Sequence, residues 1–389
     1  MPATDATPAA GTSPFIVRSV ACPLCGQEVT VRRLKTHLFI EQDRETDLRP
    51  RKYLRKKPGL TAYHPPLYFM WQCPLCRFTA GHPVFERPSQ GTGLTVDGFQ
   101  QAMQAVLYNS AKVQEALGHL RPVPQEVLDH VESMKLFYTA ILIMQENAEL
   151  EKRFALELGR YCLRLAWLYR DLREDPELRS RQAPGLAAVL KPLLPLWRKA
   201  PASEELALKF AAAYYQAALA HSAVAQDEAE AVKLSLLIAR IHVKLEQFTE
   251  ARTFWSKAMG IVKNLETKTQ QAERHAFDLR RQLKFVSDKS RNYPELSAQV
   301  VEAEREALLL ESRGKGLRLR VQEVSDLVAD LAQEFTERQV AEARRQIKEA
   351  GLVDQAEIRA FLLKSAYGER VVATIAPEPK KKGLLGMFK

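Results

Sequence analysis

Two copies of one short motif, Cys-Pro-Leu-Cys, constrain the fold of this chain more than any other feature. They occupy residues 22–25 and 73–76. Each copy places two thiols three positions apart on a tight turn, where Pro restricts φ after the first ligand and Gly26 relieves crowding after the second. Four thiols on two such turns are the donors of a tetrahedral metal site. We therefore predict a metal site formed by Cys22, Cys25, Cys73 and Cys76.

Three kinds of chemistry fit these donors. A closed set of four cysteines is typical of a structural Zn²⁺ site, but the same turns hold iron in rubredoxin-type centres because thiolates discriminate poorly between the two metals. A dithiol redox pair is the third alternative, although no thioredoxin-like pattern surrounds the motif. His37, His64 and His82 lie near the motifs in sequence and could replace a ligand, but we interpret them as ordinary surface histidines.

The remaining pattern predicts a mainly α protein with a small β-rich head. Residues 15–20, 28–33 and 67–72 read as short strands beside the cysteine turns. Helices are expected over 99–116 and 125–149, and Leu158, Cys162, Leu165, Tyr169 and Leu172 mark one apolar helical face. Cys162 on that face is expected to be a buried core residue. The proline-rich stretch before residue 203 reads as a connector, and 203–222 as an alanine-rich helix.

The C-terminal half shows narrow apolar stripes with charged flanks, which predict an antiparallel helical hairpin or coiled coil. Breaks are expected at Asn292-Tyr293-Pro294 and at Gly314-Lys315-Gly316. From these patterns we expect the following divisions: a disordered leader at 1–14, a zinc-ribbon-like domain at 15–95, a helical connector at 96–150, a repeat-like helical domain at 151–275, a long hairpin at 276–350, a short helical segment at 351–376 and a basic-apolar tail at 377–389.

The net charge of +10 is concentrated near the two ends of the chain. Residues 31–57 contain ten basic and four acidic residues. Within them, a segment with an interleaved tyrosine could contact nucleic-acid phosphates and a base: Arg49, Arg51, Lys52, Tyr53, Arg55, Lys56 and Lys57. The alternative is a solvated charged loop. The tail at 380–389 joins three lysines to apolar residues, so weak contact with a membrane surface is conceivable there.

Several absences narrow the function. The chain has no phosphate-binding Gly-rich loop, no Gly-X-Ser-X-Gly and no His-Glu-X-X-His, so we expect a protein that is not an enzyme. It shows no signal-peptide pattern and no apolar run long enough for a membrane, and its cysteines are spaced as metal ligands, which favours the cytoplasm. We expect helices 151–275 to bind a protein partner and 276–350 to allow self-association; nucleic-acid binding and redox chemistry are the alternatives.

The cysteine motifs resemble a known family. Residues 22–26, residues 66–76 with Ala80, and the helical segment 163–170 are similar to the bacterial domain-of-unknown-function family 2225, over roughly residues 22–264. The resemblance implies a cytoplasmic bacterial protein with a zinc-ribbon-like head and no established activity. Arg77 departs from the family's usual Gly in the second turn.

A second resemblance is to tetratricopeptide repeats. Phe248, Ala251, Trp255 and Ala258 match the repeat's alternation of aromatic and small residues. Glu246 replaces the usual Gly, and the closing Pro is missing. A generic helical hairpin is the alternative.

Overall fold

The computed structural model describes residues 13–56, 60–88, 94–124, 128–221, 227–365 and 367–377. The leader expected at 1–14 falls almost wholly outside these ranges, as do Lys57 and nearly all of the tail. The N-terminal elements are β1 (Phe15–Ala21), β2 (Glu28–Leu34), η1 (Thr36–Leu38), β3 (Phe39–Arg44), β4 (Pro50–Arg55), η2 (Leu60–Ala62), η3 (Pro65–Tyr68), β5 (Met70–Gln72) and β6 (Thr79–Gly81). They form antiparallel pairs β1–β2, β3–β4 and β5–β6.

The rest of the described chain is helical. The elements are α1 (His82–Glu86), α2 (Val96–Asn109), α3 (Ala111–Leu120), α4 (His130–Gln145), α5 (Ala148–Arg153), α6 (Ala155–Glu174), α7 (Pro176–Leu196), α8 (Glu204–His221), α9 (Glu228–Lys244), α10 (Phe248–Phe285), α11 (Tyr293–Glu349), α12 (Gln355–Lys364) and α13 (Glu369–Ile375). The mainly α fold with small antiparallel strand pairs is therefore confirmed.

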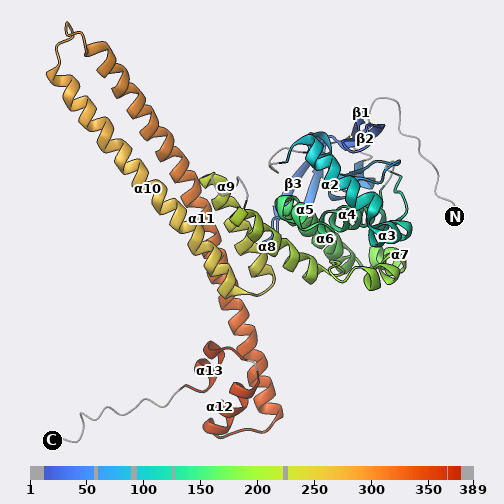
Figure 1. The fold of residues 1–389 in the computed structure, drawn as a ribbon. Coiled ribbons are helices and arrows are strands. Elements are labelled where there is room, and N and C mark those ends of the chain that lie inside the picture. Colours follow the sequence, from blue (N-terminus) through green and yellow to red (C-terminus); the bar gives the residue numbers. More distant parts are fainter. Residues whose placement is uncertain are drawn as a thin grey trace, which may run out of the picture.

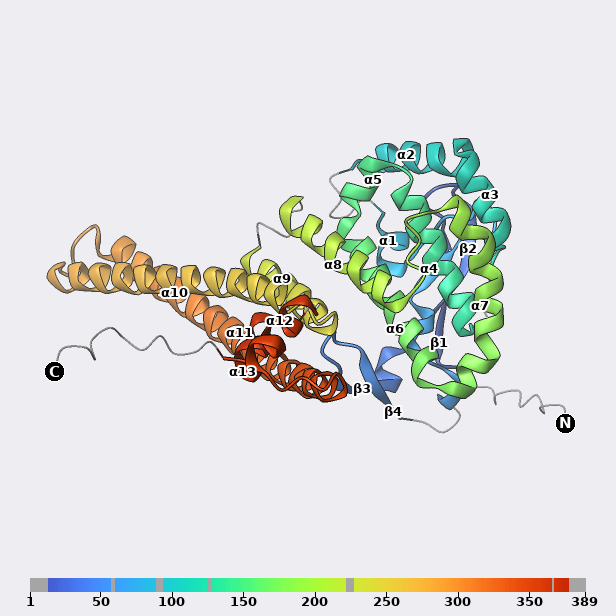
Figure 2. The same ribbon diagram turned by 90° about the horizontal axis from the view of Figure 1, so that it is seen from below.

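Figures 1 and 2 show a globular part that contains the strands and α1 to α8, with a long hairpin of α10 and α11 projecting from it. Helix α9 lies between the two parts (Figure 1). Helix α11 continues beyond the start of α10 and packs its last turns against α12 and α13, around Ala343, Ile347, Leu362 and Val371.

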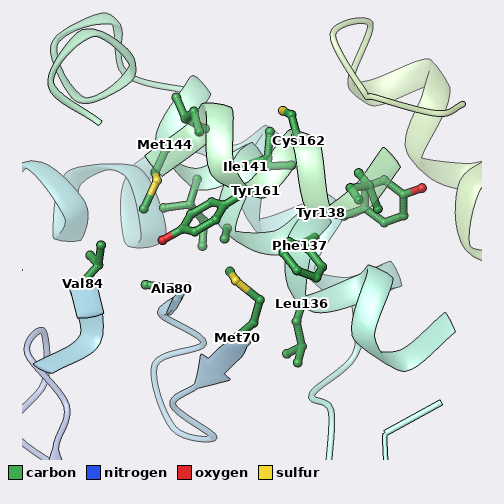
Figure 3. Close-up of a cluster of buried hydrophobic side chains, with 14 of the residues drawn as sticks. Met70, Ala80, Val84, Leu136, Phe137, Tyr138, Ile141, Met144, Tyr161 and Cys162 are labelled. Atoms are coloured by element: carbon green, nitrogen blue, oxygen red, sulfur yellow. The ribbon is translucent and has the colours of Figure 1, made fainter. Parts of the chain in front are cut away.

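One hydrophobic core joins the strands to the helices. Figure 3 shows Met70 of β5 and Ala80 of β6 facing Phe137 of α4 and Tyr161 of α6. The Tyr161 hydroxyl accepts a hydrogen bond of 2.9 Å from the backbone N–H of Gly81. The same cluster of buried residues runs from Phe15 to Ile241. The boundaries expected at residues 95 and 150 therefore fall inside a shared core.

The prediction of a proline-rich connector is wrong, because residues 176–196 form the helix α7. Three prolines lie inside this helix, at 184, 192 and 195, and each removes a backbone donor. Leu186 and Leu193 are buried seven residues apart and pack into the core. We infer that this burial outweighs the lost hydrogen bonds.

The break expected at residues 314–316 is also wrong, because α11 runs through them for 57 residues. Buried positions 307, 314, 321 and 328 repeat every seven residues, which is the spacing of a coiled-coil seam. Gly314 occupies one of these positions and places a small residue at the seam. The break at 292–294 does separate α10 from α11.

A buried ion cluster holds the β3–β4 hairpin against the helices. Arg170 of α6 is fully buried and donates to Asp47 at 2.8 and 3.0 Å, to Glu45 at 2.8 Å and to Glu204 of α8 at 2.6 Å. Lys244 of α9 donates to the same Glu45 at 2.8 Å. The tip of the hairpin, which carries the two acids, is therefore bound to α6 and α9, and Arg170 links the same cluster to α8.

Replacing Arg170 by Met is expected to destabilise the protein by about 3–5 kcal/mol, because it leaves buried carboxylates without their counter-charge. The measurement is the free energy of unfolding in urea followed by circular dichroism. The control is Arg173→Met on the same helix, whose exposed side chain pairs with Glu174 and Glu204 and should cost less than about 1 kcal/mol. Equal losses in the two variants would contradict the role of the cluster.

Candidate metal centre

The two cysteine motifs form matching turns between paired strands. Residues 22–27 link β1 to β2, and residues 73–78 link β5 to β6. In the first turn, Gly26 N donates to Cys22 O at 2.9 Å and Cys22 N to Gln27 O at 2.8 Å. In the second, Arg77 N donates to Cys73 O at 3.0 Å and Cys73 N to Phe78 O at 2.9 Å. The local sequence thus folds twice into the same backbone loop.

The four sulfur atoms converge, all within 4.8 Å of one another. The Sγ atoms of Cys22 and Cys76 are 3.6 Å apart, and those of Cys25 and Cys73 are 3.7 Å apart. Sulfurs at 2.3 Å from a tetrahedral metal ion would be separated by about 3.8 Å. The cluster is therefore positioned to bind one metal ion. Cys25 is exposed and the other three cysteines are buried.

Electrostatics within the cluster favour the thiolate of Cys22, whereas the pKa values of Cys73 and Cys76 are raised. A hydrogen bond shared between Cys22 and Cys76 lowers the pKa of Cys22 to about 5 and raises that of Cys76, because the pair retains one proton between them. Backbone N–H groups of the first turn also point to Cys22 and lower its pKa. A bound cation would replace the shared proton and ionise the remaining thiols.

Neighbouring elements fix the two turns. Gln100 of α2 donates a 2.8 Å hydrogen bond to the carbonyl of Pro23 in the first turn. Gln72, beside the second turn, donates to Thr79 at 2.9 Å and accepts from Val123 N at 3.0 Å. These contacts act on the backbone that carries the ligands, as the outer hydrogen bonds of a metal site do.

Arg77 occupies a backbone conformation that suits glycine. Its φ is +67°, close to the +72° of Gly26 at the equivalent place in the first turn. The loop geometry is therefore preserved with Arg, at a conformational cost of order 1 kcal/mol. The Nε and Nη2 atoms of Arg77 are buried and have no hydrogen-bond partner among the described residues.

None of the three nearby histidines belongs to the sulfur cluster. His37 is exposed. His82 is half-buried, with its ring 5.5 Å from that of Phe69 and 5.6 Å from that of Trp71. His64 lies beside His130 and Asp171, a grouping that the sequence analysis missed because its members are more than 100 positions apart at the extremes.

The structure divides the basic segment considered for nucleic-acid contact. The side chain of Arg49 is 11% exposed and pairs with Glu45, Asp171 and Glu174, so carboxylates already occupy its guanidinium. The ring of Tyr53 is half-buried and packs edge-on against His64. Contact of this segment with nucleic acid stays a prediction. Arg55 donates to Leu60 O, while Arg51, Lys52 and Lys56 are exposed.

Cys162 is fully buried in the apolar core, as predicted. Within the described residues, no helix is long and apolar enough to span a membrane.

We expect Cys73→Ser to abolish metal binding at the cluster and to destabilise the head by several kcal/mol, roughly in proportion to the lost binding energy. Elemental analysis of the purified chain and the unfolding midpoint followed by tryptophan emission provide the two measurements. Cys162→Ala removes a thiol outside the cluster and should retain the metal. Unchanged metal content in Cys73→Ser would show that the cluster is not the site.

The head should lose stability in mild acid through His82. Burial and the nearby Arg33 lower the pKa of His82 to about 4 from an ordinary value of 6.5. As the pH falls from 6.5 toward 4, the unfolded chain therefore takes up the proton first and stability decreases. The slope should be below about 1.4 kcal/mol per pH unit, because the ring is partly solvated.

The test compares unfolding midpoints at pH 7 and pH 5. His82→Gln should show a smaller difference between the two than the unmodified chain, whereas His119→Gln, which alters an exposed histidine on α3, should show the full difference. Metal loss in acid affects all three proteins alike. An unaltered difference in His82→Gln would exclude this histidine as the cause.

Comparison with known proteins places the chain in a family. The model of a family described as "Uncharacterized protein conserved in bacteria (DUF2225)" matches residues 15–286. No curated protein matches, and no solved structure matches. The matched region contains both cysteine turns, the buried ion cluster and the helices up to the end of α10. Since the match covers well over half of its residues, the chain belongs to the bacterial family DUF2225.

Proposed function

We propose that the chain is a non-enzymatic zinc-binding scaffold that binds a protein partner through its helical body. The observation that carries this proposal is a groove of about 600 Å³ at the junction of the globular part and the hairpin. Its lining comes from the β3–β4 hairpin and from α6, α8, α9 and α11: Arg44, Glu45, Leu48, Leu156, Arg160, Tyr215, Glu230, Lys233, Leu234, Leu236, Leu237, Arg240, Arg320, Glu323 and Val324.

The groove combines an apolar lining with charges of both signs. Leu156, Leu237 and Val324 contribute apolar surface from three different helices. Arg240 pairs with Glu323 across the groove at 2.6 Å. An apolar lining combined with charged groups is typical of a protein-binding site, and a concave surface between helices suits an amphipathic peptide or helix. Because several helices and a hairpin hold the lining residues, the groove would present a rigid surface to the partner.

Zinc is the metal we propose for the cysteine cluster. Four thiolates complete a tetrahedral shell and leave no position for substrate or water, so the ion would serve stability rather than catalysis. Iron of the rubredoxin type is the alternative for the same donors. Elemental analysis and visible absorption separate the two, since a zinc site is colourless and a ferric thiolate site absorbs strongly.

Tetratricopeptide-like repeats stay a prediction. Ala251 and Ala258 are buried between helices, but Trp255 donates to the carbonyl of Val321 in α11 at 3.1 Å, and Phe248 packs on Phe335. The residues that match the repeat thus contact α11, the other helix of the long hairpin.

Self-association through 276–350 also stays a prediction. Exposed Phe277, Leu308 and Leu319 offer an apolar surface for it, and sedimentation equilibrium would test it.

A charge placed in the groove should weaken partner binding. We expect Leu237→Asp to reduce recovery of a cross-linked partner from bacterial lysate by at least about tenfold, equivalent to about 1.4 kcal/mol of binding energy. Leu206→Asp changes an exposed leucine of α8 outside the groove lining and should leave recovery unchanged. Quantitative mass spectrometry of the captured proteins is the measurement. Equal recovery with both variants would rule out the groove as the binding surface.

A further inference from the structure

A second group of metal-ligating side chains lies outside the cysteine cluster. His64 precedes η3, His130 begins α4 and Asp171 lies near the end of α6. The Nε2 atom of His64 is 3.0 Å from Asp171 Oδ2, and the Nε2 atom of His130 is 3.4 Å from the same oxygen. One ligand atom from each of these three separate segments therefore lies within 4.8 Å of the other two.

We propose that His64, His130 and Asp171 form a binding site for a divalent transition-metal ion. Two imidazoles and one carboxylate are the donors that Zn²⁺, Fe²⁺ and Mn²⁺ take in proteins. Nitrogen and oxygen ligands about 2.1 Å from a metal ion are separated by about 3.0 Å in octahedral and about 3.4 Å in tetrahedral geometry. The separations of 3.0 and 3.4 Å between Asp171 Oδ2 and the two imidazole nitrogens lie in this range, so an ion requires little movement of these atoms.

The burial of His130 is a second observation that points to a bound ion. The residue is 9% exposed, and its Nε2 atom, although 3.4 Å from Asp171 Oδ2, makes no well-aligned hydrogen bond with any described residue. A buried polar atom without a well-formed hydrogen bond is costly, and a metal ion between the three ligand atoms would satisfy it. The His64 and His130 rings are stacked at 5.7 Å, with an interplanar angle of 19°, so both present the same edge to Asp171.

Arg49 orients the carboxylate for this role. Its guanidinium binds the Oδ1 atom of Asp171, which leaves Oδ2 facing the two imidazoles. The carboxylate is therefore held from behind, as the ligands of metal sites are. Glu45 and Glu174 balance the charge of Arg49.

The two metal sites differ in their access to solvent. The cysteine cluster offers four protein ligands, whereas this one offers three, and the His64 side chain is 31% exposed. A position on that side remains open to water, which is the arrangement of sites where the ion itself takes part in binding or chemistry. This inference stands apart from the groove and from partner binding.

Metal stoichiometry of the full chain tests the proposal. After saturation with Zn²⁺ and removal of excess, the unmodified chain should hold one more ion than His64→Ala and than His130→Ala. The affinity of the second site for Zn²⁺ should fall by roughly 100-fold or more in either variant. His37→Ala, which removes an exposed histidine, should keep the full complement. Circular dichroism verifies that each variant is folded.

Co²⁺ provides a readout that does not depend on the variants. Binding at the cysteine cluster gives strong thiolate-to-cobalt charge-transfer absorption, whereas binding to two imidazoles and a carboxylate gives only weak visible bands. We expect both signals in the unmodified chain. Co²⁺ at the cysteine cluster should give the charge-transfer absorption, and Co²⁺ at the second site should add weak visible bands without further charge-transfer absorption. A single ion per chain at saturation, or a second ion retained in both histidine variants, would overturn the proposal in favour of a hydrogen-bonded His–Asp–Arg cluster.

Discussion

The burial of Arg170 is the constraint on which the arrangement of this molecule depends. A guanidinium without exposure to water requires carboxylates at hydrogen-bond distance, and Glu45, Asp47 and Glu204 supply them from two other segments. The two acids of the β3–β4 tip therefore have to enter the helical layer. Lys244 extends the same network to α9. The hairpin, α6, α8 and α9 are consequently fixed relative to one another.

The groove and the grouping of His64, His130 and Asp171 both depend on that placement. Glu45 and Leu48 of the hairpin tip line the groove, and Arg49, the next residue after Leu48, binds Asp171. Adjacent residues of α6, Arg170 and Asp171, thus both bind residues of the same tip. The insertion between the two cysteine motifs is basic in composition, yet its tip uses both acidic and basic side chains to form ion pairs with α6. Residues of both strands, such as Glu41 of β3 and Lys52 of β4, face solvent.

Several features of the fold were predictable because they depend on neighbours in sequence. The two cysteine turns, strands β1 and β2, the apolar face of α6 and the seam of α11 all follow from local spacing. The prolines of α7 and Gly314 of α11 misled the sequence analysis because local propensity was outweighed by packing, through Leu186 and Leu193 in the first case and through a coiled-coil seam in the second. The convergence of His64, His130 and Asp171 had no local signal at all.

Short-range patterns of residue types were therefore enough to predict the donor set of the cysteine cluster, the mainly α composition and the long C-terminal helices. The tertiary structure, by contrast, places the Arg49 guanidinium among three carboxylates and packs Tyr53 on His64. It also decided that strands and helices share one core. The physical reason is that burial and ion pairing depend on which distant segments meet, and the periodicity of a single segment carries no information about its partner.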